Sequence, residues 1–451
     1  MITTSSVTRG ESRDTTSHLA RFEEFERSVA GNSPAWLRAI RTAGIAHFAE
    51  QGFPTTRHEE WRFTNVAPIA AFPFKPATRP QYDGVTDQAI EAHTFGGMAC
   101  HRLVFVNGHF SPQLSTLLPR PDGVKLGCLA AAIHSDGPLV EKHLGRYAGY
   151  TENPFVAFNT AFIQDGAFIH IPARVELAEP VHLLFLTTEA GLTTFPRNLI
   201  IADRSSSVKV VEDHVSLVPL AHFTCPVTEI VTAENAAVEH LKLQRENESA
   251  FHVGAVQAAQ AADSRVISHS ISLGARLARN NIHLVLNGPG IDSILNGLYL
   301  AGGEQLMDHH TVADHASPRC NSHEFYHGIL CGKARGVFNG KIFVRQIAQK
   351  TDAKQTNRNL LLSDLASVDT KPQLEIFADD VKCTHGATVG QLDEQAIFYL
   401  RSRGIGLNDA RNMLVKAFAG GILDRITIDP VRAELERTLF ERLEREQQAG
   451  S

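Results

Sequence analysis

The chain has 451 residues, of which 43% are hydrophobic and 20% charged, and its formal net charge is −6. This length suits two or three domains, or one elongated repeat domain with appendages. There is no polybasic run and no apolar run near the roughly 20 residues of a membrane span, so we expect neither nucleic acid nor a membrane as a partner.

The six cysteines are scattered without a CxxC pair, and no hydrophobic signal segment precedes them. This pattern predicts reduced thiols and a cytoplasmic location. Residues 1–16 are rich in Ser and Thr with mixed charges, which predicts a disordered tail.

Residues 17–155 are expected to form a helical and α+β region. Apolar residues such as Leu19, Phe22 and Phe25 recur at helical spacing. A strand is predicted at Arg102–Val106, before a turn. The segment 57–64 is charged and aromatic, and it is either a docking surface or a turn with Trp61 anchored in a local core; we favour the turn.

Short strands follow one another from residue 156 to residue 390. Apolar residues alternate with serines across 267–273, and Gly, Asn, Asp and Pro separate the segments. No convincing helix lies between them, which excludes alternating βα units and leaves an all-β sandwich, barrel or solenoid. More than two hundred residues is long for one sandwich, whereas a β-helix extends by adding turns.

Helical patterns return over residues 391–451. Asp393 and Glu394 open a helix that Gly404 closes; a second helix is predicted from Asn408 to Gly420-Gly421, and a third begins at Asp429-Pro430. Amphipathic helices at the end of a β domain either pack on that domain or hold a partner, and the pattern favours neither.

The segment His323–His327 matches the H-E-x-x-H motif of zinc peptidases. That motif needs a helix, where positions i and i+4 can reach one metal ion. The residues that follow it are typical of strands and turns, and on a strand the two histidines would lie about 13 Å apart. We favour a chance match and keep a zinc-dependent metallopeptidase using His323, Glu324 and His327 as the alternative.

Phosphate-binding loops are missing from the sequence. Gly332-Lys333-Ala334 lacks the glycine spacing and the Ser or Thr of a Walker A loop. We therefore expect no ATP hydrolysis by this chain alone.

Cys383 and His385 stand one residue apart, so on a strand they point to the same side. Thiolate and imidazole are suitable ligands for iron or an iron–sulfur cluster. The simpler interpretation is a packed cysteine and a hydrogen-bonded imidazole. One Cys and one His cannot complete a four-ligand site, so a metal role would require a second chain.

The junction Lys382–Gly390, with the sequence Lys-Cys-Thr-His-Gly-Ala-Thr-Val-Gly, resembles the C-terminal signature of the SufB/SufD family, and within it the SufD branch. Segments 335–342, 357–363 and 370–376 are similar to the β domain of that family, and Glu60–Thr64 is similar to its N-terminal motif. SufB-like chains carry a Glu-x-Glu pair around the junction histidine and a cysteine on the preceding strand. This chain has Gly386 after His385 and no cysteine in 358–362, and both differences favour SufD.

The resemblance implies a mainly β fold, a right-handed parallel β-helix over 156–390, between the N-terminal region and a C-terminal helical subdomain. It implies a non-catalytic scaffold that works with a SufB-like paralogue and a SufC-like ABC ATPase in iron–sulfur cluster assembly and transfer. A transient cluster or iron would be shared with the partner chain through His385, with or without Cys383. The terminal helices resemble the ATPase-docking segment, with Phe398, Tyr399, Arg401, Arg403 and Ile405 as candidate contacts. A heterodimer and a homodimer remain alternatives.

Overall fold

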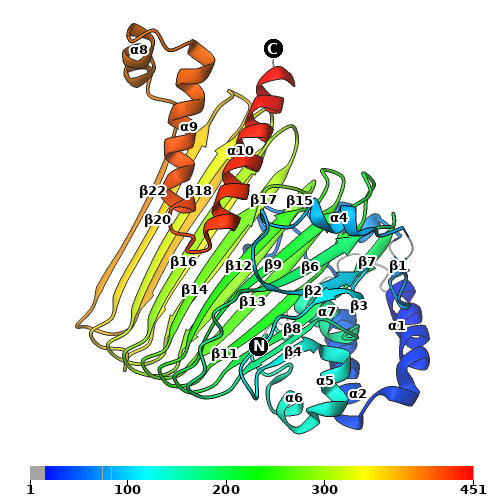
Figure 1. Ribbon diagram of the computed structural model, residues 1–451. Helices are drawn as coiled ribbons and strands as arrows, with labels where there is room; N and C mark the ends of the chain where they lie inside the picture. The colour runs from blue at the N-terminus through cyan, green and yellow to red at the C-terminus, as the bar shows by residue number, and fades with distance from the viewer. Residues whose placement is uncertain (1–15, 74, 83, 450–451) are drawn as a thin grey trace, which may run out of the picture.

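The computed structural model describes residues 16–73, 75–82 and 84–449. The tail expected at residues 1–16 lies outside this range except for Thr16, where helix α1 (Thr16–Val29) begins. The described chain is mostly β, with a parallel β-solenoid of about 8 turns and helices at both ends (Figure 1). The predicted mainly β solenoid with flanking helices is therefore confirmed.

Two sheets, named A and B here, run along the solenoid, and from β11 onward successive strands alternate between them. Sheet A contains, in spatial order, β4 (Lys125–Cys128), β5 (Ala167–Ile171), β8 (Arg197–Ala202), β11 (Val227–Thr232), β13 (Phe251–Gln260), β15 (Leu277–Leu286), β17 (Leu306–His315), β19 (Arg335–Val344) and β21 (Ser367–Ile376). Sheet B contains β3 (His109–Thr116), β2 (His101–Val106), β6 (Val181–Thr187), β9 (Ser207–Ser216), β12 (Ala237–Arg245), β14 (Arg265–Ser272), β16 (Asp292–Ala301), β18 (Asn321–Leu330), β20 (Asp352–Leu361) and β22 (Lys382–Gly390). The short strands β1 (Lys75–Pro76), β7 (Leu192–Thr194) and β10 (Phe223–Thr224) extend sheet A.

The corners between sheets repeat with the turns of the solenoid. Ser205, Asn235 and Asp263 have φ values of 57°, 58° and 56°, the left-handed conformation that a sharp corner requires. The backbone N–H of Ser205 donates to Glu234 in the next turn, and that of Asn235 donates to Ala262. Corners and strands therefore hydrogen-bond from turn to turn, which keeps the strands in register.

The space between sheets A and B, called the lumen here, is filled by every second side chain of each strand. Its core is continuous from Leu103 on β2 to Phe338 on β19. Glycines give room to the largest rings: a Cβ on Gly297 would overlap the ring of Tyr326, and a Cβ on Gly328 would overlap the ring of Tyr299. Each turn is thus fitted to the side chains of its neighbours.

Helices and short segments cover the N-terminal end of the solenoid. They are η1 (Ala30–Asn32), α2 (Ala35–Gln51), η2 (Glu59–Trp61), α3 (Ala67–Ala71), α4 (Asp87–Glu91), α5 (Leu129–Ser135), α6 (Gly137–His143) and α7 (Pro154–Ala161). Trp61 is buried in an aromatic cluster with Phe155, and the guanidinium of Arg279 lies 3.6 Å from the centre of its ring. The favoured prediction for this segment, a turn anchored by Trp61, is confirmed. The predicted strand at Arg102–Val106 is β2, which pairs with β6 in sheet B.

Three helices, α8 (Glu394–Ser402), α9 (Leu407–Leu423) and α10 (Asp429–Ala449), follow the last strand. Asp393 caps α8 as predicted, accepting from Gln395 and Ala396. The predicted bounds of the second helix were wrong, because α9 begins one residue before Asn408 and continues through Gly420-Gly421. Burial of Ile422 and Leu423 against sheet B outweighs the low helix propensity of the two glycines. No described helix is long and apolar enough to cross a membrane.

The close packing in the lumen predicts a position-specific response to one added methyl group. We expect Gly328→Ala to lower the free energy of unfolding by about 1–3 kcal/mol, because the new Cβ overlaps the buried Tyr299 ring. Gly386→Ala on β22 is the matched control, since nothing lies within 4 Å of its Cβ position. Urea unfolding of both variants measures the difference, and equal effects would contradict this packing.

Candidate functional site

The last turn of the solenoid ends in two open edges. β21 ends sheet A and β22 ends sheet B, so among the described strands neither has a neighbour on its outer side. Large apolar side chains are exposed around this end: Ile347 and Leu365 at corners, Phe377 just after β21, and Val389 on β22. Long edge strands with exposed apolar groups are templates for pairing with another chain.

Cys383 lies on β22 and its side chain is half-buried at the end of the lumen. It is paired in register with the buried Ala353 and packs on a small cluster that includes Ile342 and Val344. Burial raises the pKa of the Cys383 thiol, and the negative charge of Asp352 adds to the effect. Both effects favour the protonated thiol, which is a poorer metal ligand than the thiolate.

His385 lies two residues further along the same strand and is exposed. It follows Cys383 on the lumen side, and its register partner on β20 is Gln355. Among the described residues, no three His, Cys, Asp or Glu side chains are grouped so that they could hold a metal ion. The structure brings Cys383 and His385 to one open edge, and their role as ligands stays a prediction.

The His323–His327 motif lies in β18, as its flanking residues predict, and not in a helix. Glu324 points into the lumen, whereas His327 faces the opposite side, where its Nδ1 lies 2.9 Å from the carbonyl oxygen of Phe418. His323 is half-buried, and its Nε2 lies 4.0 Å from Asp352. The three side chains do not converge, so the zinc-peptidase alternative is wrong.

Glu324 nevertheless has an unusual environment. It is fully buried, and one carboxyl oxygen, Oε2, accepts hydrogen bonds from Thr311 at 2.8 Å and from Gln355 at 3.0 Å. Burial raises the pKa of Glu324 to about 7, although both hydrogen bonds act in the opposite direction. Gln355 is a residue that was not predicted from the sequence. The signal was present as the amides at every second position of β20, Gln355, Asn357 and Asn359.

A second buried polar group occupies the middle of the lumen. Glu212 pairs with His214 at 2.8 Å and with His240 at 3.0 Å. Although burial opposes ionisation, the hydrogen bonds from these imidazoles hold the pKa of Glu212 well below its usual value. Lys242 follows on the same face of β12, and its pKa is lowered by burial. These buried groups belong to the interior and are remote from the open edge.

Helix α8 stands away from the solenoid beyond β22 (Figure 1). Ile397 is its buried residue, while Phe398 is 76% exposed and Tyr399 is 56% exposed. Arg403 donates to the hydroxyl of Tyr399 at 2.7 Å and lies over its ring. Arg401 is exposed and Ile405 is half-buried. The five residues predicted for partner docking thus lie on or just after one protruding helix.

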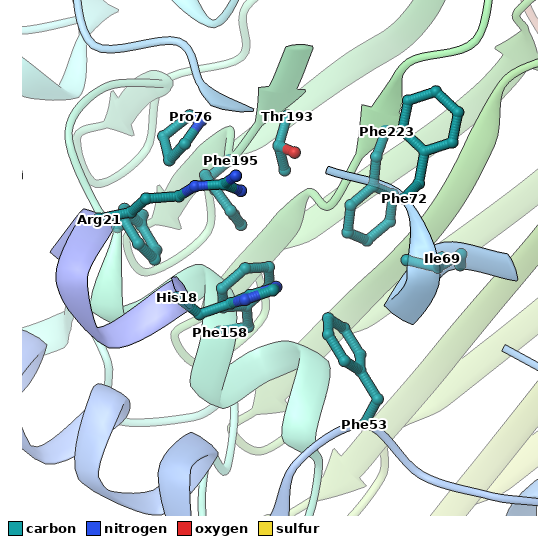
Figure 2. A pocket seen from close by; sticks show the side chains of 11 residues that line it. His18, Arg21, Phe53, Ile69, Phe72, Pro76, Phe158, Thr193, Phe195 and Phe223 are labelled. Carbon is teal, nitrogen blue, oxygen red and sulfur yellow. The ribbon is translucent and has the colours of Figure 1, made fainter. Parts of the chain in front are cut away.

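Figure 2 shows an aromatic pocket near the N-terminal helices. His18 and Arg21 from α1 line it together with phenylalanines from several segments. The His18 ring packs against Phe48, Phe53 and Phe158 at centroid distances of 5.3–5.8 Å. We assign this region to the packing of the N-terminal helices on the solenoid, away from the open edge (Figure 1).

Comparison with known proteins gives consistent matches over nearly the whole chain. Residues 185–418 match the family model described as SUF system FeS cluster assembly, SufBD core domain, and residues 12–183 match the SufBD protein N-terminal region. An iron–sulfur cluster assembly SufBD family protein from Synechocystis is 34% identical over 91% of this chain and 92% of its own length. The iron–sulfur cluster assembly protein SufD of Escherichia coli is 33% identical over 87% of this chain and 90% of its own. SufD of Bacillus subtilis is 26% identical over 89% and 93%.

The environment of Glu324 predicts a pH-dependent stability. Its pKa is about 7 when folded and 4.5 as the ordinary value, so the folded state retains a proton that the unfolded chain releases. The free energy of unfolding therefore falls as the pH rises between these two values. The side chain introduced by Glu324→Gln cannot ionise. We therefore expect the free energy of unfolding of this variant, relative to that of wild type, to be higher at about pH 8 than at about pH 4, by up to about 3 kcal/mol.

Urea unfolding at the two pH values measures this difference. Glu304→Gln, at a carboxylate that is 81% exposed, is the control and should show no such change. A stability difference between Glu324→Gln and wild type that is the same at both pH values would show that Glu324 ionises normally.

Proposed function

Because the chain belongs to the SufB/SufD family, whose role is in iron–sulfur cluster assembly, we propose that it is a non-catalytic scaffold subunit on which a cluster is assembled and from which it is transferred. Its partners in this proposal are a SufB-like paralogue and a SufC-like ABC ATPase. The observation that carries the proposal is the open last turn of the solenoid, where His385 is exposed on an unpaired edge strand.

The open edge supports pairing with a second solenoid. β21 and β22 contain 10 and 9 residues, and no strand in the described part of the chain bonds their outer N–H and C=O groups. A partner solenoid can bond both edges in the way that one turn bonds the next. The exposed Phe377, 60% accessible, and Val389 would be buried in the same contact. A SufB-like paralogue is the proposed partner, and a second copy of this chain is the alternative.

The donor groups at this edge suit a cluster that is cargo and not a resident cofactor. His385 offers an exposed imidazole, while Cys383 is half-buried and burial raises the pKa of its thiol. One exposed nitrogen cannot hold a cluster, so the partner chain would supply the remaining ligands. A shared, incomplete site of this kind releases the cluster when the two chains move apart.

Helix α8 is the proposed docking element for the ATPase. Three residues, 391–393, join the end of β22 to the start of α8. α9 and α10 are fixed on sheet B by an apolar cluster that includes Val415, Leu435 and Leu298. A force on α8 would therefore reach β22 through a short connection, and would act on the strand that carries His385.

The ligand role predicts the effect of one substitution at the open edge. We expect His385→Ala to reduce cluster assembly by the purified three-protein complex at least about tenfold, while the complex stays intact. Thr384→Ala, an exposed neighbour facing the other side of β22, is the matched control. Absorbance and iron content after anaerobic reconstitution measure assembly, and size-exclusion chromatography measures integrity. Unchanged assembly in an intact complex would rule out His385 as a ligand.

The proposed docking role of α8 predicts a loss of ATPase binding. Phe398→Ala should weaken binding of the ATPase at least about tenfold without lowering the stability of this chain, because a 76% exposed ring supports binding and not folding. Leu220→Ala, 55% exposed on a loop remote from α8, should leave the affinity unchanged. Isothermal titration calorimetry with the purified ATPase measures the affinity of each variant. Equal affinities for the two variants would show that α8 is not the docking element.

A further inference from the structure

The last turns of the solenoid place Glu324, Gln355 and His385 in one column. Gln355 is the register partner of Glu324 on one side and of His385 on the other. Parallel strands in register stack the side chains of partner residues about 4.8 Å apart, and all three here face the lumen. Glu324 and Gln355 are buried, whereas His385 is exposed at the open edge.

The amide of Gln355 is held on two sides. Its Nε2 donates to Oε2 of Glu324 at 3.0 Å, and the same oxygen accepts from Thr311 at 2.8 Å. On the facing sheet stands Gly340, and a Cβ at that position would overlap Nε2 of Gln355. A hydrogen bond and a missing side chain therefore fix the orientation of this amide.

The carbonyl oxygen of the same amide, Oε1, is buried and has no hydrogen-bond partner among the described residues. Leaving a buried acceptor without a donor is costly, and folded proteins pair such groups. The next side chain in the column toward the open edge is His385. Its imidazole always carries at least one N–H, so it can supply the donor that Oε1 lacks.

We propose that Gln355 is a positioning residue for His385: its Oε1 accepts a hydrogen bond from one imidazole N–H. This bond leaves the other ring nitrogen unprotonated and facing outward. Histidines that bind metal ions use their second nitrogen in this way, which fixes both tautomer and ring orientation. The use of the free nitrogen as a ligand rests on the function proposed above, whereas the hydrogen bond itself does not.

The tautomer of His385 tests the contact directly. The isolated full-length chain is labelled with ¹⁵N-histidine, and the two ring-nitrogen shifts, recorded at about pH 8.5, report the tautomer. Loss of signals in His385→Ala assigns the residue. We expect one predominant tautomer in wild type and a mixture in Gln355→Met, which keeps the length of the side chain but removes Oε1. Thr356→Val, the next residue on β20 and facing the other side, should keep the wild-type spectrum.

Gly340→Ala tests the same contact in a second way. The added methyl group displaces the Gln355 amide without removing a polar atom, so we expect the same mixture of His385 tautomers. Gln355→Glu keeps an acceptor oxygen and should restore one tautomer. Far-UV circular dichroism confirms that each variant is folded. An unchanged tautomer of His385 in folded Gln355→Met or Gly340→Ala overturns the proposal.

The tautomer measurement uses neither a partner chain nor a cluster. Failure of the His385→Ala assembly experiment would remove the ligand role and leave the hydrogen bond in place. Failure of the tautomer experiment would remove the positioning residue and leave the ligand role in place.

Discussion

Hydrogen bonding between successive turns is the constraint on which the rest of this structure depends. Each interior strand hydrogen-bonds to its two neighbours in the same sheet, which belong to the previous and the next turn. The corners hydrogen-bond from turn to turn in the same direction. Such a stack has no intrinsic end, because every finished turn presents a new edge. How each end of the solenoid is closed therefore decides what the protein can bind.

The two ends are closed differently. At the N-terminal end, β3 and β4 pair antiparallel with β2 and β5 and are the outermost strands of the two sheets, so the parallel stacking ends there. Helices α5 and α6 add an apolar cover over this region. At the other end, β21 and β22 remain open, and α9 and α10 lie along the outer face of sheet B instead of across the edge (Figure 1). At the open end, β21 and β22 are long parallel strands that can bond a further turn in the way that successive turns bond each other.

Much of the fold was predictable, and the residues that escaped prediction share a physical cause. Strand patterns were readable from alternation, and the residues after His327 showed that the His323 motif lies on a strand. The stacking of turns was not readable, because register is a long-range property, and the resemblance supplied it. Alternation also cannot tell lumen from surface, so Glu324 and Gln355 were not recognised as buried partners. Tertiary packing likewise carried α9 past its glycines.

Buried polar side chains are unevenly distributed along the lumen. Near the closed end the lumen holds Leu103, Ile169 and Leu183, which stabilise without fixing a register. Its middle holds Glu212 with His214 and His240, and its last turns hold Glu324 and Gln355. Directional hydrogen bonds are lost if one turn slips against the next, so they specify position where apolar packing does not. In the proposed function, an edge that presents His385 at a defined place to a partner chain needs that specification more than it needs added stability.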